Sequence, residues 1–323
     1  MHLTVLSRSE GIYTTRRLLE AARARGHTAR VVDPLDVELG LGEGVPALHW
    51  RRKRFPRTDV IVPRIGLSVH PHGLSVVNQL ELLGIPVLNG ASAIQASRNK
   101  ARSLQLLAAA GVRVPRTVMA SAATGLREMA RLVGGVPVLV KLSSPGEKSG
   151  VMICETWESL EAALEAILGL GQDIVVQQYL HGAKGRDLRA LVVGGRVVAA
   201  LRRRPAMGKL ASNLRRGARF EAADLPAPHA RAAARAAEVL GLEVCAVDLL
   251  EVRGRPLVFD VNASPGIREA EVAGGVDVAA RIVERAEALA RPSGRRLVAG
   301  EASPRRARRQ PGPDPGRADG PAR

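Results

Sequence analysis

Aromatic residues are nearly absent from this chain. Phe, Trp and Tyr together make up 2% of its 323 residues. Proteins that bind single-stranded nucleic acid stack its bases on aromatic side chains, so we expect no direct reading of nucleic acid. Cysteine is equally rare, since Cys154 and Cys245 are the only two. Both lie in apolar runs without metal-ligand spacing, which indicates buried side chains in a reducing compartment.

Long apolar runs are missing as well. No segment approaches the ~20 apolar residues that a transmembrane helix needs. The chain also opens directly into a strand-like segment instead of a secretory leader. We therefore expect a cytoplasmic protein with no membrane partner.

Several motifs of nucleotide chemistry and covalent catalysis are also missing. The first predicted strand is not followed by Gly-x-Gly-x-x-Gly, which argues against a dinucleotide site there. The chain has neither a P-loop nor a kinase His-Arg-Asp motif. It also has no Ser/His/Asp or Cys/His set that would indicate covalent catalysis by a protein nucleophile.

Positive charge is what the chain has in excess. Its net charge is +17, which attracts phosphates or acidic proteins. The segment 291–323 carries nine Arg against three carboxylates, so 9 − 3 = +6 belongs to it and +11 to the rest. With six Pro, five Gly and no aromatic residue, this tail cannot bury a core, and we expect it to be disordered. It is either a solvated extension or a tether to RNA or an acidic partner.

Three predicted blocks precede the tail. Residues 1–95 alternate short strands with glycine-terminated helices, the pattern of a small α/β domain with a parallel sheet. Residues 96–179 begin with a predicted helix over 97–110 and continue as a small α+β lid. Residues 180–290 hold two predicted hairpins, a basic stretch between them and a last helix.

Lys141 lies in an otherwise apolar predicted strand over 137–142. Burying its ammonium is costly unless an anion meets it. The small-residue loop 143–150 follows, and the backbone amides of such loops accommodate phosphate. The pattern indicates a phosphate site. The alternative is a lysine whose ammonium reaches solvent at the strand end.

The second hairpin, within residues 243–266, carries the most informative carboxylates. A turn centred on Gly254 places Asp248 opposite Asp260, and Asn262 shares their face because side chains alternate along a strand. Two opposed carboxylates repel each other, so a cation is expected between them. Two carboxylates and an amide oxygen suit Mg²⁺ better than zinc or copper. The alternative is an exposed sheet face with ordinary acidic residues.

Two arginine features leave both a functional and a structural interpretation open. The basic stretch 202–219 suits phosphates and carboxylates, which arginine binds with two parallel hydrogen bonds, but it is also compatible with a solvated loop. Arg64 ends a predicted strand, where open α/β sheets bind ligands, although a lone arginine is commonly a surface residue. A lysine with a small-residue loop, a Mg²⁺ site and arginines together indicate phosphoryl transfer from ATP.

Short motifs along the chain carry a family resemblance. They are Leu-Ser-Arg at 6–8, Pro-Arg-Ile-Gly at 63–66, Lys-x-Arg-Ser-x-Gln-Leu-Leu at 100–107, Val-Lys-Leu at 140–142, Val-Gln-Gln-Tyr at 176–179, Asp-Leu-Arg at 187–189, Ser-Asn-Leu-Arg-Arg-Gly at 212–217, Val-Asp-Leu-Leu at 247–250 and Asp-Val-Asn-Ala-Ser-Pro-Gly at 260–266. Over roughly residues 1–290 they resemble the RimK family of ATP-grasp α-L-glutamate ligases. The resemblance implies an α/β and α+β chain: an ATP-grasp fold with an N-terminal Rossmann-like pre-ATP-grasp domain over 1–95, a lid over 96–179 and a catalytic domain over 180–290.

The same resemblance implies roles for individual residues. ATP would be bound by Lys100, Lys141, Gln178, Tyr179, Asp187, Arg189, Ala211, Ser212 and Asn213. Catalytic roles would fall to Arg203 and Arg216, and the metal ligands would be Asp248, Asp260 and Asn262. This chain differs from the usual family pattern in its loop 143–150, which has fewer glycines, and at Gln178, Ala211 and Asp260, where the family usually has Glu, Arg and Glu.

The implied reaction joins a carboxylate to the amine of L-glutamate. ATP would phosphorylate the carboxylate, and the amine would then displace phosphate, with Mg²⁺ or Mn²⁺, in two ions, as cofactor. The best-known family members act on a small-subunit ribosomal protein and are commonly homo-oligomers. The acceptor could instead be a cofactor, a carrier protein or a free peptide. The rival hypothesis is a ribosome- or RNA-binding protein that kept the fold without catalysis.

Overall fold

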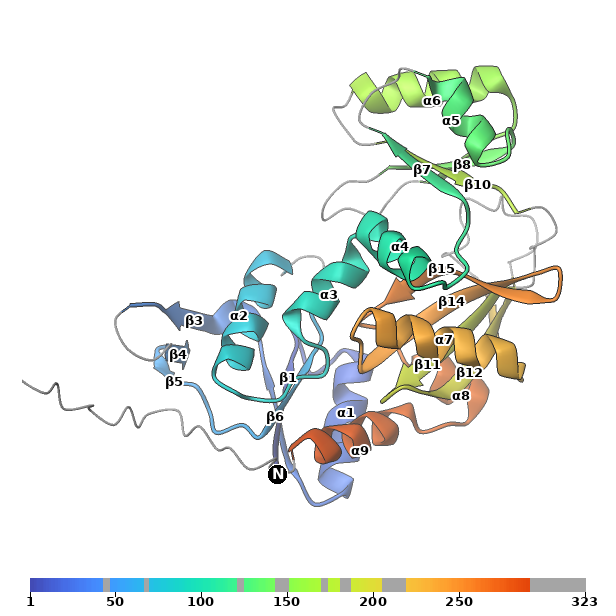
Figure 1. Cartoon of the computed structure of the whole chain (residues 1–323). Helices are drawn as coiled ribbons and strands as arrows, with labels where there is room; N and C mark the ends of the chain where they lie inside the picture. Colours follow the sequence, from blue (N-terminus) through green and yellow to red (C-terminus); the bar gives the residue numbers. More distant parts are fainter. Residues whose placement is uncertain are drawn as a thin grey trace, which may run out of the picture.

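The computed structural model describes residues 1–42, 47–66, 70–120, 125–142, 151–169, 174–180, 187–204 and 219–290. The strands of these residues form four sheets, arranged in three parts of the molecule (Figure 1). The loop 143–150, the part of the basic stretch over 205–218 and the tail 291–323 lie outside the described residues. Within the described residues, no helix combines the length and the apolar character needed to span a membrane.

A parallel three-stranded sheet forms the N-terminal part, as the alternation of strands and helices predicted. Its order is β2-β1-β6. It contains β1 (His2–Leu6), β2 (Thr28–Val32) and β6 (Val60–Pro63), with helix α1 (Tyr13–Ala24) connecting β1 to β2. Gly26 ends the helix at a φ of 77°, a left-handed conformation that glycine adopts without steric cost.

A small antiparallel sheet between β2 and β6 was not predicted. It follows the 3₁₀ turn η1 (Pro34–Asp36) and consists of β3 (Val37–Gly40), β4 (Ala47–Trp50) and β5 (Lys53–Arg54). Its strands have only four, four and two residues and are mostly half-exposed or exposed, so their apolar alternation is too short to signal a strand. Helix α2 (His70–Leu82) then packs beside this sheet and the parallel sheet through a shared apolar cluster.

The helix predicted over 97–110 is two helices, so that prediction was wrong. Helix α3 (Ala91–Arg98) ends at Asn99, and α4 (Lys100–Ala109) starts immediately after it. The Asn99 side chain accepts a hydrogen bond of 2.9 Å from the Arg102 amide. Asparagine is a preferred N-cap residue, and here it starts a new helix with Lys100 at its first position.

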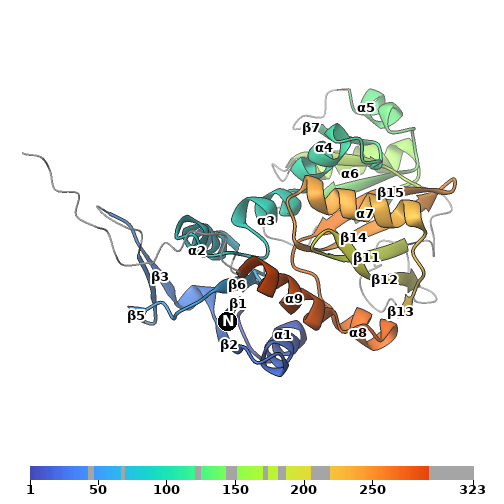
Figure 2. The same cartoon turned by 60° about the horizontal axis from the view of Figure 1, so that its bottom comes forward.

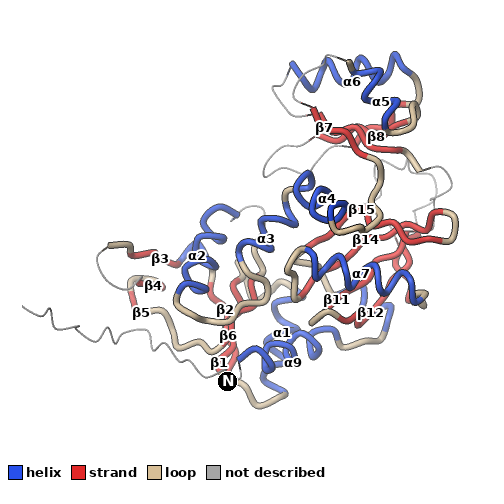
Figure 3. Tube along the Cα trace, in the orientation of Figure 1, coloured by secondary structure: helices blue, strands red, loops and turns tan. Residues whose placement is uncertain are grey.

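The lid is an antiparallel sheet of order β7-β10-β8-β9 with two helices on one face (Figure 3). Its elements are β7 (Thr117–Ala120), α5 (Leu126–Leu132), β8 (Val138–Leu142), β9 (Val151–Cys154), α6 (Trp157–Gly169) and β10 (Ile174–Gln178). Leu160 and Leu164 of α6 pack on Val138 and Val140 of β8. Cys154 lies in the same cluster, as the sequence indicated for both cysteines.

A five-stranded sheet of order β13-β12-β11-β14-β15 forms the third part. Its elements are β11 (Asp187–Val193), β12 (Arg196–Arg204), β13 (Arg219–Ala222), α7 (Ala227–Val239), β14 (Val244–Val252), β15 (Arg255–Asn262), α8 (Arg268–Gly274) and α9 (Val278–Ala290). One face carries an apolar cluster that includes Ala190, Cys245, Val247 and Val261, and α7 covers it.

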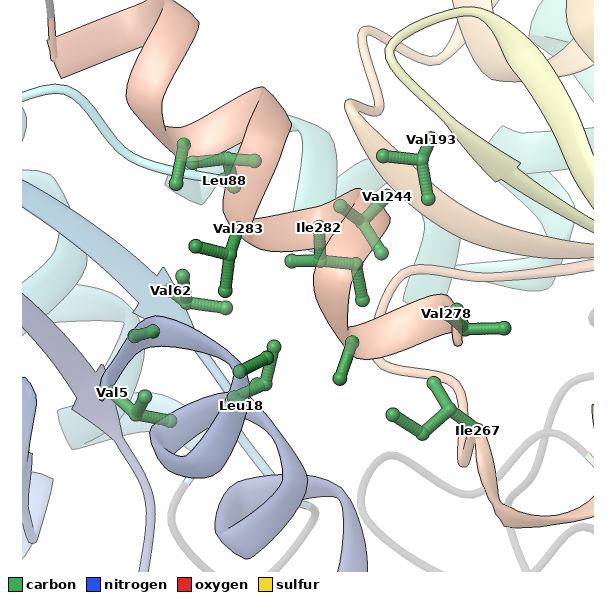
Figure 4. Packing of buried hydrophobic residues seen from close by; sticks show 14 of the residues in the cluster. Val5, Leu18, Val62, Leu88, Val193, Val244, Ile267, Val278, Ile282 and Val283 are labelled. Atoms are coloured by element: carbon green, nitrogen blue, oxygen red, sulfur yellow. The ribbon is translucent and has the colours of Figure 1, made fainter. Parts of the chain in front are cut away.

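The opposite face of this sheet is apolar along only half of its length. There Leu191, Val193 and Val244 join a cluster with Ile282 of α9 and Leu18 of α1 (Figure 4). Helix α9 therefore packs beside α1, although more than 250 residues separate them (Figure 2). The shared core fixes the N-terminal sheet relative to the five-stranded sheet, because both contribute fully buried side chains to it.

Candidate active site

The polar half of that face gathers most of the described candidate residues. Asp187 and Arg189 project from β11 on the same face, two residues apart. The strand pairing sets Asp187 opposite Arg203 and Arg189 opposite Asp248. Asp248 in turn lies opposite Asp260. Four neighbouring strands thus bring these five charged side chains to one place.

The β14–β15 hairpin reaches the predicted pairing through a bulge. Its turn has two residues, Arg253 and Gly254, with φ values of 53° and 70°, so Val252 pairs with Arg255. That register alone would set Phe259 opposite Asp248. The register shifts beside Asp248, so that Asp260 faces it instead. A bulge of one extra residue re-aims a side chain in this way.

Asp248 is the most enclosed carboxylate of the cluster. Its two oxygens accept hydrogen bonds of 2.7 and 2.8 Å from Nε and Nη2 of Arg189. Nη2 of Arg203 donates a third bond of 3.2 Å. Burial favours the neutral acid, but these bonds and charges outweigh it and hold the pKa of Asp248 below its usual value. Arg189 and Arg203 therefore supply part of the positive charge that the sequence predicted beside the opposed carboxylates.

Asp187 differs from Asp248 because its ion pair with Arg203 is longer than the pair between Asp248 and Arg189. Nη1 of Arg203 lies 3.4 Å from its carboxylate. Burial, opposed by the charge of Arg203, raises the pKa of Asp187 to about 6. The guanidinium groups of Arg189 and Arg203 also lie 5.9 and 5.8 Å from the ring of Phe220 on β13, which supports them by cation–π attraction.

Lys100 joins the cluster from the N-terminus of α4. Its ammonium forms an ion pair with Asp260 and donates hydrogen bonds to the carbonyl oxygens of Val261, at 3.2 Å, and Ser97, at 3.4 Å. Three oxygens from two elements therefore surround one cation. The break at Asn99 makes this possible, because it gives Lys100 a position that one continuous helix would not.

The end of the hairpin carries oxygen donors of the type that hard metal ions prefer. Asp260 and Asn262 supply oxygens on one face, and the ammonium of Lys100 already occupies an oxygen-lined cation position beside them. Such oxygen donors suit Mg²⁺. Asp248 also faces this place, with both oxygens bonded to arginines. The described residues hold no group of three or more His, Cys, Asp or Glu suited to a metal.

The lid carries three further candidate residues. Lys141 lies on β8, opposite Val175 of β10 and Val151 of β9. Gln178 is the last residue of β10, and Tyr179 follows it. The backbone N–H of Gln178 donates a 2.8 Å hydrogen bond to the backbone carbonyl of Arg116. Figure 1 shows the lid sheet above the five-stranded sheet. The remaining candidates, Ala211, Ser212, Asn213 and Arg216, lie outside the described residues.

Asn89 supports the site from a position that the sequence did not single out. Its side-chain amide donates to the carbonyls of Val244, at 2.7 Å, and Ala263, at 2.8 Å, and its oxygen accepts from the Val244 amide at 2.8 Å. It is buried and ties the start of β14 to the end of β15. In the sequence Asn89 precedes Gly90 and is typical of a turn, so no local signal marks this role.

Solved structures with the same architecture define the class of fold. The ATP-grasp ligase PsnB complexed with its minimal precursor superposes with a TM-score of 0.71 at 23% identity, over 89% of this chain and 98% of that chain. Its complex with a phosphomimetic variant of the precursor, Mg and ADP gives a TM-score of 0.68 at 23% identity, with the same coverage. At this identity the likeness shows the fold alone, and the predicted ATP-grasp fold is confirmed.

Sequence comparison then identifies the family. The model of the RimK PreATP-grasp domain matches residues 1–94, and that of the RimK-like ATP-grasp domain matches residues 97–286. A curated relative in Teredinibacter turnerae, named "Probable alpha-L-glutamate ligase", is 43% identical over 90% of this chain and 97% of its own length. The chain belongs to the RimK family of ATP-grasp proteins, and the predictions of this family and of an ATP-dependent ligase are confirmed.

Proposed function

We propose that this enzyme joins L-glutamate, through its amine, to a carboxylate of a protein or peptide acceptor, with ATP as the energy source. The proposal rests on the opposed pair of carboxylates, Asp248 and Asp260. Three cations contact this pair: Lys100, Arg189 and Arg203. Transfer of a phosphoryl group requires charge neutralisation and positioning. A cluster with this density of both charge signs supplies them.

The two chemical steps make different demands on the cluster. The acceptor carboxylate first attacks the γ-phosphorus of ATP, which releases ADP and forms an acyl phosphate. The glutamate amine then attacks the acyl carbon, loses a proton and expels phosphate. Arg203, with Arg216 from outside the described residues, would stabilise the negative charge that develops in both steps.

The nucleotide would lie between the lid and the five-stranded sheet. In this proposal Lys100 and Lys141 contact phosphates, and Gln178 and Tyr179 line the adenine pocket. Asp187, Arg189 and residues 211–213 complete the nucleotide site. Asp248, Asp260 and Asn262 would hold Mg²⁺ or Mn²⁺, in two ions, and the metal would supply charge neutralisation at the phosphates. The domains in this assignment span 1–95, 96–179 and 180–290, with the tail at 291–323.

A peptide or protein is the favoured acceptor. A solved structure of the ATP-grasp ligase PsnB contains a precursor peptide, which supports an acceptor of this kind. A small-subunit ribosomal protein is the first candidate to test, because the best-known members of the RimK family act on one. A cofactor, a carrier protein or a free peptide would serve the same chemistry.

The test measures ADP release by the full chain with Mg·ATP and L-glutamate, with and without each candidate acceptor. Mass spectrometry of the acceptor then reports a ladder spaced by glutamate residues. Asp260→Ala should abolish both signals, whereas Glu251→Ala, a carboxylate on the other face of the same hairpin, should leave them unchanged. Wild-type protein that binds no ATP and releases no ADP would favour the non-catalytic binding protein instead.

A further inference from the structure

Arg64 lies at the carboxyl edge of the parallel sheet. It follows the last residue of β6, and its amide donates a 2.8 Å bond to the carbonyl of Leu6, the last residue of β1. Ligands of open α/β sheets bind beyond this edge. The side chain is partly buried, although Arg64 lies just beyond the end of β6.

No carboxylate pairs with Arg64 in the part of the chain that the structure describes. Burial without a counter-ion lowers the pKa of Arg64 to about 10. A buried charge without a partner is costly and occurs where a ligand or function requires it. Arg189, Arg203 and Lys100 differ in this respect, since each contacts a carboxylate of the five-stranded sheet. Arg98 instead donates to backbone carbonyl oxygens.

A chain of contacts connects Arg64 to the charged cluster. Nη2 and Nη1 of Arg98 donate to the carbonyl oxygens of Ile65 and Gly66, directly after Arg64. Arg98 ends α3, and Lys100, only two residues later, contacts Asp260. Residues two apart have Cα atoms within about 7 Å of each other. Arg98 therefore ties the segment after Arg64 to the end of α3, from which the chain leads directly to Lys100.

The place of Arg64 in the fold favours a substrate other than ATP. Arg64 belongs to the N-terminal sheet, whereas the lid and the five-stranded sheet carry the residues proposed for the nucleotide (Figure 1). Its guanidinium presents a planar fork that matches a carboxylate with two hydrogen bonds. Both non-nucleotide substrates of the proposed reaction carry carboxylates.

We propose that Arg64 binds a substrate carboxylate, in the first instance that of the incoming L-glutamate, and thereby selects an acidic substrate. The proposal rests on the proposed function for the reaction but assigns a residue and a ligand chemistry of its own. The same fork would equally fit the carboxylate of the acceptor, so the kinetic test separates the two sources.

The test compares wild-type enzyme with Arg64→Met and Arg64→Lys in ADP release. Loss of a bidentate, charge-assisted pair should raise KM for L-glutamate by about 30- to 100-fold, with KM for ATP unchanged. Arg64→Lys keeps the positive charge but not the planar guanidinium, so its KM for L-glutamate should lie between those of wild type and Arg64→Met. Arg57→Met removes an exposed arginine ahead of the same strand and serves as the matched control with wild-type constants.

Substrate analogues identify the carboxylate. L-Glutamine lacks the side-chain carboxylate, and isoglutamine lacks the α-carboxylate. The analogue without the group that Arg64 holds should bind wild-type and Arg64→Met enzyme equally. A rise in KM for the acceptor alone would mean that Arg64 binds a carboxylate of the acceptor instead of one of L-glutamate.

Unchanged KM values for both carboxylate substrates in folded Arg64→Met would overturn the proposal, as would a rise in KM for ATP alone. Circular dichroism establishes folding, and Arg64→Lys carries the test where Arg64→Met does not fold. Calorimetric titration of glutamate into wild-type and Arg64→Met protein measures binding apart from turnover. An inactive wild-type enzyme that still loses glutamate binding on Arg64→Met would contradict the proposed reaction but keep the carboxylate site.

Discussion

Arg189→Met should destabilise the protein far more than removal of an equally well-paired arginine at the surface. Arg189 and Asp248 form a bidentate pair whose side chains are 23% and 6% exposed. Two unit charges about 4 Å apart attract by about 4 kcal/mol at an effective dielectric constant of 20. Breaking a buried pair typically costs about 3–5 kcal/mol, because the remaining charge stays desolvated.

A matched pair near the surface joins helix α9 to the residue before β14. Arg285 donates to Glu243 with bonds of 2.8 and 2.9 Å, and these side chains are 35% and 31% exposed. Exposed pairs contribute about 0–1 kcal/mol. Arg285→Met should therefore cost about 1 kcal/mol or less, so that burial is the main difference between the two substitutions.

Urea denaturation of both variants, followed by circular dichroism, measures the two losses in unfolding free energy. The expected difference between them is about 2–5 kcal/mol. Asp248→Asn should resemble Arg189→Met, because it leaves Arg189 and Arg203 without their shared counter-ion. Equal losses for Arg189→Met and Arg285→Met would refute the view that the buried ion cluster holds this end of the sheet together.

Three further predictions address other parts of the molecule. Hydrogen bonds from Arg25 lower the pKa of Glu287 from 4.5 to about 2. Burial opposes this shift, and a hydrogen bond from His27 adds to it. The partly exposed ion pair of Glu287 with Arg25 should contribute about 1 kcal/mol to stability. This contribution is present above pH 4.5 and is lost as the pH falls towards 2. The difference in unfolding free energy between wild type and Glu287→Gln, measured by urea denaturation at several pH values, should therefore disappear over that range. Ile282→Ala should cost about 2–5 kcal/mol in the same assay, because its side chain fills the core between α9, α1 and the five-stranded sheet. Arg253→Asn should raise the midpoint of thermal unfolding, since asparagine tolerates the left-handed conformation that arginine holds there at a φ of 53°.

Each of these has a contrary result. A gap for Glu287→Gln that persists at pH 2 would remove the carboxylate from the acid response. A loss below about 1 kcal/mol for Ile282→Ala would mean that the core closes over the missing atoms. A lower melting temperature for Arg253→Asn would show that the arginine side chain stabilises the hairpin by contacts that outweigh its backbone strain.

The β14–β15 hairpin shows how far local pattern carries a site prediction. The sequence placed Asp248 opposite Asp260 from a symmetric turn about Gly254, and the pairing is confirmed. The route to it is different, because a two-residue turn and a bulge near Phe259 combine to restore the register. Strand alternation is a property of every extended chain, so the face was predictable, whereas the bulge depends on packing against neighbouring strands.

The lid and the N-terminal part show where local pattern fails. Strands β3, β4, β5 and β7 are short and partly exposed, so their burial period was too weak to detect. Asn99 interrupts a continuous helical pattern, and its role as an N-cap requires knowing that the chain turns there.

The sequence by itself determined the parallel N-terminal sheet, the acidic hairpin and the family, because alternation, glycine stops and short motifs are local properties of the chain. Only the tertiary structure decided which cations meet which carboxylates. Asp248 meets Arg189 and Arg203 across neighbouring strands, and Asp260 meets Lys100 from a distant helix. Pairing across a sheet and docking of a helix depend on the packing of the whole core, and no window of sequence contains that information.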